Sequence, residues 1–362
     1  MTLLHPSHQV TAQPAPPSPS APAAALAGAR QDRPDVVAAG VLCWRPARDG
    51  GVEVLVVHRP EHDDWTWPKG RPERREQPAE CAVRSTAADT GVRVVLGRPL
   101  PPVRYALPDG PVKEVSYWAA RVTGRHDPAA RPAGRPGGRP GGRPGDRRPG
   151  GPTDRVDGAR WLRPEEAAER LTHPADAAPL VALAALAAEG TLDTVATLVV
   201  RHATARPRDA WARADADRPL VASGRRQAMA LGALLQCWRP DVVLSSPWRR
   251  CRETLDPYLA AARPRLRTKG GLSEAGHRRA PGKAARHVRS LLESAHGGAL
   301  CTHRPVLEAV LDAVRLWCTP EAARQVPDRN PFLHPGDVLV AHVVHGQRRR
   351  PVVVAVERHG TR

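Results

Sequence analysis

Arginine and histidine side chains follow three apolar runs in the second half of this 362-residue chain. Arg201 and His202 come after the run in VVRHATA, Arg250 lies in LSSPWRRCRET, and His303 ends the run in LCTHRPV. Guanidinium groups bind phosphate oxygens through two parallel hydrogen bonds, and a neutral imidazole can attack phosphorus to form a phosphohistidine. These residue types therefore predict a phosphate pocket and a nucleophile that work without a metal ion.

The elements that must position these side chains alternate along the chain. Strands are expected at 196–200, 241–246 and 298–303, and helices at 223–238, 249–262 and 305–318. This alternation predicts an α/β domain with a mainly parallel sheet, in which sites gather at the carboxyl ends of strands. We therefore expect the arginines and histidines to converge on one edge of the sheet. Glu274, in GGLSEAGH, is the candidate for the acid that protonates a leaving oxygen.

Residues 195–318 resemble the histidine phosphatase superfamily, which has the phosphoglycerate-mutase-like fold. The family signature, Arg-His-Gly after the first strand, is Arg-His-Ala at 201–203 in this chain. SSPWRRCRET fits the family pattern Ser-x-x-x-x-Arg-x-x-x-Thr, which selects Arg250. The resemblance implies that His202 is the nucleophile and Glu274 the acid. It also implies a phosphate pocket made by Arg201, Arg250 and His303. A second Arg-His-Gly, at 358–360, has no helix after it, and we interpret it as a chance match.

The stretch WPKGRPERREQPAECAVRSTAADTGV, residues 67–92, resembles the Nudix box of hydrolases that cleave nucleoside diphosphates linked to another moiety. Five positions of the box keep their residue types: Gly70, Glu76, Arg84, Gly91 and Val92. Three positions that carry glutamates in the family are instead Ser85, Ala88 and Asp89. The frame of the motif is present, but most of its acids are not.

This loss affects the metal site that the resemblance would imply. Positions i, i+3 and i+4 share one face of a helix, and the family's acids there hold Mg²⁺ against a pyrophosphate. Asp89 is the one acid left of the three, and Glu76 and Glu80 on neighbouring turns do not restore the cluster. We expect Mg²⁺-dependent hydrolysis to be absent or severely weakened. Lys69, just before the box, and Gly70, its first residue, are candidate substrate contacts.

The two resemblances imply an α/β protein with two domains. The first is a Nudix-like α/β/α sandwich with a mixed sheet, and the second is the histidine-phosphatase-like domain with a mainly parallel sheet. The expected boundaries are a disordered Pro/Ala-rich tail at 1–34, the Nudix-like domain at 35–175, a linker at 176–193 and the phosphatase-like domain at 194–362. An Arg/Pro/Gly-rich disordered insertion is expected at 126–153, because its composition cannot bury a core.

The composition bears on which partners the protein could bind. The formal net charge is +18, almost all of it from arginine, in a chain also rich in Ala, Gly and Pro. A GC-rich genome would impose this composition without a functional reason, so the charge favours a basic pocket, and we consider nucleic acid an unlikely partner. The six cysteines have no metal-binding spacing, and we expect reduced, mostly buried thiols. Since the sequence has no signal peptide or membrane segment, we expect a cytoplasmic protein; its oligomeric state is not indicated.

The sequence thus predicts a phosphohydrolase that acts on a small, nucleotide-type substrate through a phosphohistidine. The Nudix-like domain would mainly bind or orient the substrate, and the phosphatase domain would need no cofactor. One alternative is a Mg²⁺-dependent Nudix pyrophosphohydrolase of oxidised nucleoside triphosphates or dinucleoside polyphosphates, with Asp89, Glu76 and Glu80 as an altered metal site. The other is a non-enzymatic protein that binds nucleotides or nucleic acid through the Arg-Pro-Gly repeat at 134–151.

Overall fold

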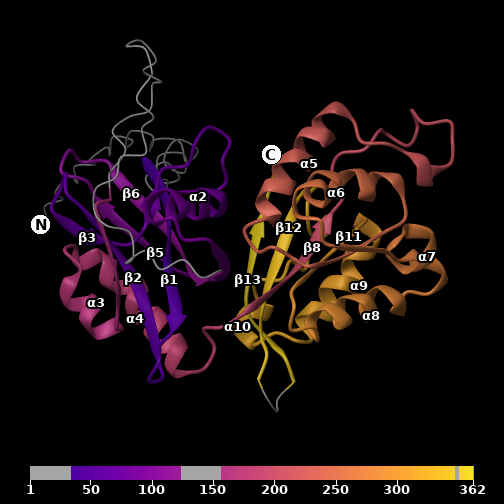
Figure 1. Ribbon diagram of the computed structural model, residues 1–362. Coiled ribbons are helices and arrows are strands. Elements are labelled where there is room, and N and C mark those ends of the chain that lie inside the picture. Colours follow the sequence, from indigo (N-terminus) through magenta and orange to yellow (C-terminus); the bar gives the residue numbers. More distant parts are fainter. Residues whose placement is uncertain (1–33, 124–155, 347–349, 362) are drawn as a thin grey trace, which may run out of the picture.

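The computed structural model describes residues 34–123, 156–346 and 350–361. Nearly all of the Pro/Ala-rich tail, and the whole insertion at 126–153 with its repeat, lie outside the described residues. In the described part, two β-sheets lie side by side, and each is covered by helices (Figure 1). The protein is therefore a mixed α/β molecule with two layered parts, as the sequence predicts.

The first sheet has seven described strands, with the order β3-β2-β1-β6-β5 along its main path. Their bounds are β1 Val36–Pro46, β2 Val52–Arg59, β3 Asp64–Thr66, β4 Lys69–Gly70, β5 Val94–Ala106, β6 Val112–Val122 and β7 Gly158–Leu162. β1 pairs with β6 in parallel and with β2 and β4 in the antiparallel sense. The sheet is mixed, as expected for a Nudix-like domain.

Strand β1 is buried on both faces because helices cover both sides of this sheet. Successive side chains of a strand point to opposite faces. Ala39 and Val41 pack in the core that contains α2 (Pro78–Thr90), while Ala38 and Leu42 pack in the core that contains α3 (Pro164–Arg170) and α4 (Ala177–Ala188). These helices and the sheet form an α/β/α sandwich.

Helix α4 occupies most of the segment that we expected to be a linker at 176–193. Leu180 and Leu183 on α4 are buried in the core of the first sheet, and Leu192 beyond the helix joins them. The helix itself reads AAPLVALAALAA, so its alanines favour helix and its leucines supply an apolar face. The segment belongs structurally to the first part, and only a few residues separate α4 from the second sheet.

The second sheet has six described strands, in the order β10-β9-β11-β8-β12-β13. Their bounds are β8 Val195–Arg201, β9 Val242–Ser245, β10 Arg265–Thr268, β11 Gly298–Thr302, β12 Val338–Val344 and β13 Val352–His359. The first four in this order are parallel, and β12 and β13 add an antiparallel hairpin at one edge. The sequence predicted the parallel strands but not this hairpin.

Helices cover both faces of the second sheet as well (Figure 1). α5 (Ala222–Leu235) and α6 (Arg249–Ala262) contribute to the core on one face, and α8 (Gly282–Leu292) and α9 (Arg304–Arg315) to the core on the other. Two short helices, α7 (Glu274–Arg279) and α10 (Pro320–Ala323), complete this part. No helix in the described residues is long and apolar enough to span a bilayer. All six cysteines are free thiols, and only Cys318 is not fully buried.

The two parts meet along β13 and the end of α5 (Figure 1). The backbone N–H of Leu96 on β5 donates to the carbonyl of Cys237 at 2.9 Å. Trp118 on β6 donates its indole N–H to the Glu357 carboxylate on β13 at 3.0 Å. One apolar cluster includes buried residues from both parts. The seam is thus a packed interface with a buried carboxylate in it.

We predict that Glu357→Gln destabilises the protein. Burial acts to raise the pKa of Glu357, but the hydrogen bond with His342 (2.8 Å) and the nearby ring of His359, whose Nε2 lies 3.0 Å from the carboxylate, lower it to about 2. A depressed carboxylate pKa stabilises the fold above the unfolded-state value and loses that effect as pH falls toward the folded value. The shift corresponds to about 3 kcal/mol, which urea unfolding at neutral pH should detect as a lower unfolding free energy.

The exposed Glu308→Gln on α9 is the matched control and should leave stability unchanged. Between pH 4.5 and 2, wild-type protein should lose more unfolding free energy than Glu357→Gln, because the variant has no charge at this position to lose. Equal pH profiles for the two proteins would contradict the prediction.

Candidate active site

The predicted phosphate ligands lie at the carboxyl ends of adjacent parallel strands. β8 ends at Arg201, with His202 next, and β11 ends at Thr302, with His303 next. β11 pairs with both β8 and β9, so the ends of the three strands meet at one edge of the sheet. β9 leads through a short turn into α6, whose second residue is Arg250. The sequence prediction of convergence at one sheet edge agrees with this placement.

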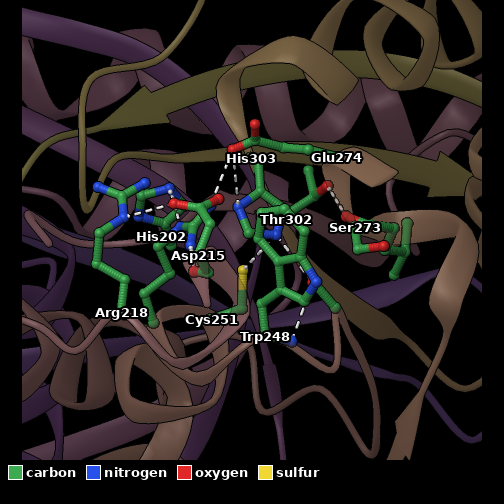
Figure 2. Close-up of polar contacts among 12 residues, drawn as sticks. His202, Asp215, Arg218, Trp248, Cys251, Ser273, Glu274, Thr302 and His303 are labelled. Atoms are coloured by element: carbon green, nitrogen blue, oxygen red, sulfur yellow. Dashed lines mark hydrogen bonds and ion pairs between the residues drawn. The ribbon is translucent and has the colours of Figure 1, made fainter. Parts of the chain in front are cut away.

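Figure 2 shows His202 and His303 close together, with Glu274 beside them. The ring centroids of His202 and His303 are 5.1 Å apart, in an edge-to-face arrangement. Arg250 donates its Nε–H to His202 Nε2 at 3.3 Å and its Nη2–H to Glu274 Oε1 at 2.9 Å. Arg201 lines the same cavity, which has a volume of about 380 Å³. The five residues that the sequence assigned to the phosphatase site are therefore in one place.

His202 presents one ring nitrogen to this site. Its Nδ1 lies 2.8 Å from the carbonyl of Ala203, which is an acceptor only, so Nδ1 carries the proton and Nε2 has the lone pair. Burial, with Arg250 and Arg201 nearby, lowers the pKa of His202 to about 3. The imidazole is consequently neutral near pH 7, with a free electron pair directed at Arg250.

The backbone after His202 is fixed by the pattern that identified Arg250. The hydroxyl of Thr254, four residues after Arg250, accepts a hydrogen bond from the Ala203 N–H at 2.9 Å. The same hydroxyl donates to the Arg250 carbonyl at 2.6 Å. The spacing Arg-x-x-x-Thr thus places the arginine and the support of the histidine loop on one helical turn.

His303 is fully buried and is held on both sides. Its Nε2 lies 2.8 Å from the Ser246 hydroxyl, and its Nδ1 lies 3.7 Å from Glu274 Oε1. Trp248 packs edge-on against the ring at a centroid distance of 4.8 Å. Burial, followed by the charges of neighbouring groups including Arg250, lowers the pKa of His303 well below its usual value. His303 is therefore also neutral, and its Nδ1 side faces Glu274.

Arg250 is completely buried, and carboxylates balance its charge. Besides Glu274, its guanidinium contacts Asp215 Oδ2 at 3.3 Å and the Asp215 carbonyl at 2.8 Å. It also stacks over the Trp248 ring, with 4.5 Å from Cζ to the centroid. A buried guanidinium is tolerated when it is paired and hydrogen-bonded in this way. Glu274 itself opens α7, where the Ser273 hydroxyl caps the helix.

Sequence reasoning missed several residues of this site. The cavity is also lined by Arg208, Arg218 and Arg304, and Asp215 holds Arg218 at 2.8 Å and Arg208 at 3.1 Å. Three of these four lie in the loop before α5, which has no motif or periodicity to mark it. Arg304 directly follows His303, and its position next to a predicted phosphate ligand was an available signal.

In the first part of the protein, Lys69 and Gly70 form the short strand β4. The ammonium of Lys69 is buried, contacts the Thr66 hydroxyl and lies 3.3 Å from Asp176 Oδ2. Burial lowers the pKa of Lys69. Gly70 lies against Ser85, because an added Cβ would be 2.1 Å from the serine Oγ. The predicted role of both residues as substrate contacts stays a prediction, while their observed contacts are with the protein.

The acids proposed for the altered metal site have structural partners. Glu76 forms a two-point ion pair with Arg84, at 2.6 and 2.7 Å. Glu80 accepts the Gln77 N–H at 2.8 Å and caps α2. Asp89 lies near the end of the same helix. Within the described residues, no group of three or more His, Cys, Asp or Glu could hold a metal ion. The residues present thus do not fit the Mg²⁺ site of a Nudix hydrolase.

Comparison with known proteins identifies two family domains. The family model for the NUDIX domain matches residues 34–184, and that for the histidine phosphatase superfamily (branch 1) matches residues 197–298. The 8-oxo-(d)GTP phosphatase of Mycolicibacterium smegmatis is 33% identical over 304 residues, which cover 81% of this chain and 83% of the relative. The order of the two domains follows the order predicted from the sequence.

Among solved structures, the protein histidine phosphatase SixA in complex with tungstate is 17% identical, with a TM-score of 0.35, and covers 46% of this chain and 97% of its own. A binary complex of the Ap4A hydrolase of C. elegans is 20% identical, with a TM-score of 0.31, and covers 42% of this chain and 98% of its own.

Proposed function

This chain is a hydrolase of the family that joins a Nudix domain to a histidine phosphatase domain, and we propose that it releases phosphate from a nucleotide-type substrate through a phosphohistidine at His202. The observation that carries the proposal is the contact of a neutral His202 Nε2 with the buried Arg250, beside His303 and Glu274. A nucleophile, phosphate ligands and an acid are then present in one cavity.

In the first step, the lone pair of His202 Nε2 attacks phosphorus as the bond from phosphorus to the leaving oxygen breaks. Arg201 and Arg250 hold the phosphoryl oxygens, and a bound phosphate competes with Glu274 for the Arg250 guanidinium. Once the phosphate has displaced it from Arg250, the Glu274 carboxylate takes up a proton from solvent and then gives that proton to the leaving oxygen. In the second step, Glu274 takes a proton from water, which attacks the phosphohistidine and releases phosphate and free His202.

The relative and the charge of the cavity both support the proposed substrate class. The M. smegmatis relative is named as an 8-oxo-(d)GTP phosphatase, so oxidised guanine nucleoside triphosphates are the first substrates to test. Arg208, Arg218 and Arg304 line the cavity outside the inner phosphate ligands and suit an additional phosphate. We propose that the Nudix-like part mainly binds or orients the nucleotide.

A chelation experiment separates this mechanism from Mg²⁺-dependent Nudix hydrolysis. Phosphate release from 8-oxo-dGTP and from p-nitrophenyl phosphate is measured in excess EDTA and again with added Mg²⁺. Because the proposed chemistry uses arginine and histidine instead of a metal, we expect rates in EDTA within about twofold of those with Mg²⁺. Loss of both activities in EDTA, with recovery on adding Mg²⁺, would favour the Nudix alternative.

A further inference from the structure

A second cavity in the phosphatase domain is larger than the candidate active site. Its volume is about 620 Å³, and it shares no lining residue with the catalytic cavity. The 3₁₀ turn at Gly270–Leu272, α7 and the start of α8 form its walls. Figure 1 shows α7 and α8 on the side of this domain that faces away from the first part. Neither the sequence patterns nor the proposed mechanism uses this cavity.

Every ionisable side chain that lines this second cavity is basic: Arg279, Lys283, Arg286 and His287. No carboxylate lines it, and in the described part of the chain no ion pair joins Arg279, Lys283 or Arg286 to an acid. The Arg250 site differs sharply, because two carboxylates balance that guanidinium. Among the described residues, therefore, no acid is paired with the arginines or the lysine of the second cavity.

The spacing on α8 concentrates this charge. Positions 283, 286 and 287 are i, i+3 and i+4, so the three side chains share one helix face, where like charges repel one another. The ring of His287 is partly buried, and its pKa is lowered by that burial and then by Lys269 and its neighbours on α8. A bound anion would relieve this repulsion, and no described side chain does so.

Glycines let the walls of this cavity pack closely together. A Cβ on Gly271 would lie 2.7 Å from the Lys283 Cβ, and one on Gly276 would lie 1.9 Å from the Gly270 carbonyl oxygen. The turn can approach α8 at Gly271, and α7 at Gly276, this closely only because these positions have no side chains. α8 has eleven residues, and no side chain caps its first turn, so its backbone N–H groups add positive potential at the cavity edge.

We propose that this cavity is a second anion site that binds the polyphosphate chain of a small ligand. Four basic side chains suit several phosphate oxygens, and the volume exceeds what one phosphate needs. Among the described residues that line the cavity there is no Phe, Tyr or Trp, and the imidazole of His287 is the only ring available to a base. The ligand is recognised through its phosphates, whether it is an inorganic polyphosphate or a nucleoside polyphosphate.

The test is a calorimetric titration of the full-length protein with imidodiphosphate, which is not hydrolysed, in EDTA. The variant K283A/R286A removes two cations from the cavity. The matched control R278A/R289A removes two exposed arginines from the same pair of helices outside it. We expect the control to bind two anions, and K283A/R286A to lose one of them or bind it at least about tenfold more weakly. Identical titrations of the two variants would overturn the proposal.

A second titration distinguishes the two ligand sources. A β,γ-imido nucleoside triphosphate that also fills the cavity points to a nucleotide, while binding of imidodiphosphate alone points to inorganic polyphosphate; both support a polyphosphate site. Binding that requires the nucleoside overturns it. Thermal melting without ligand checks that both variants fold. Because the readout is the difference in bound anion between two variants with intact catalytic residues, it stands even if turnover does not depend on His202.

Discussion

Replacing His202 with alanine is expected to lower phosphate release by about 10⁴-fold or more, the scale seen when an enzyme loses its nucleophile. The Nε2 atom that Arg250 contacts at 3.3 Å is the proposed site of the bond to phosphorus. Without it, arginines can still bind the phosphoryl group but cannot form the intermediate. The assay is phosphate release from p-nitrophenyl phosphate and from 8-oxo-dGTP, each at saturating substrate.

The exposed His296→Ala controls for loss of a histidine elsewhere in the domain and should keep full activity. Acid quenching destroys a phosphohistidine, so protein that carries labelled phosphate from the substrate is trapped under alkaline conditions. Wild-type protein and His296→Ala should carry the label, and His202→Ala should not. Wild-type turnover by His202→Ala would exclude the mechanism. If the turnover of this variant disappeared in EDTA, the reaction would be assigned to the Nudix-like part.

Motif residues on regular elements could be placed from the sequence because the elements themselves are periodic. Arg201, His202 and His303 each follow a buried strand, and strand order then brings them together. The Arg-x-x-x-Thr spacing selected Arg250 instead of Arg249. The structure gives the reason for this spacing, because the threonine one turn after Arg250 contacts the loop after His202. For these residues, local pattern and tertiary position are linked by the geometry of a parallel sheet.

The missed residues lack such a link. Asp215 and Arg218 lie in a long loop, where nothing in the sequence fixes which side chains point inward. Ser246 and Trp248 come from the turn after β9, and their contacts with His303 depend on a strand more than fifty residues away. Long-range pairing of this kind is not encoded in the spacing of neighbouring residues.

In the Nudix-like part, the glycines and some of the polar residues of the box are kept, but its remaining acids make structural contacts. The sequence identified missing acids, and the structure shows what the remaining ones do: Glu76 pairs with Arg84, and Glu80 caps α2. Both contacts stabilise the turn and helix of the box without a metal. The linker was expected at 176–193 because a new strand begins after it, but the leucines of α4 within this segment are buried against the first sheet.

Glu274→Gln is expected to have the second largest effect, and the effect should depend on the leaving group. For a nucleotide or alkyl phosphate, whose leaving oxygen needs a proton, kcat should fall by about 10²- to 10⁴-fold. For p-nitrophenyl phosphate, whose leaving group departs without protonation, the decrease should be less than about tenfold. Glutamine keeps an oxygen that can accept from Arg250 Nη2, which is 2.9 Å away in the wild-type protein, but it has no proton to give.

The variant Asp215→Asn serves as a comparison that shows whether Glu274 donates a proton or only positions Arg250. Asp215 contacts the same guanidinium at 3.3 Å, but it is not the proposed acid. Its loss should lower activity toward both substrates by similar factors, because a displaced Arg250 binds any phosphoryl group less well. If Glu274→Gln also slows both substrates equally, Glu274 serves to hold Arg250, and the leaving-group proton must come from water. A strong preference for the activated substrate in Glu274→Gln alone assigns the proton to Glu274, because only the loss of a proton donor makes the rate depend on what is leaving.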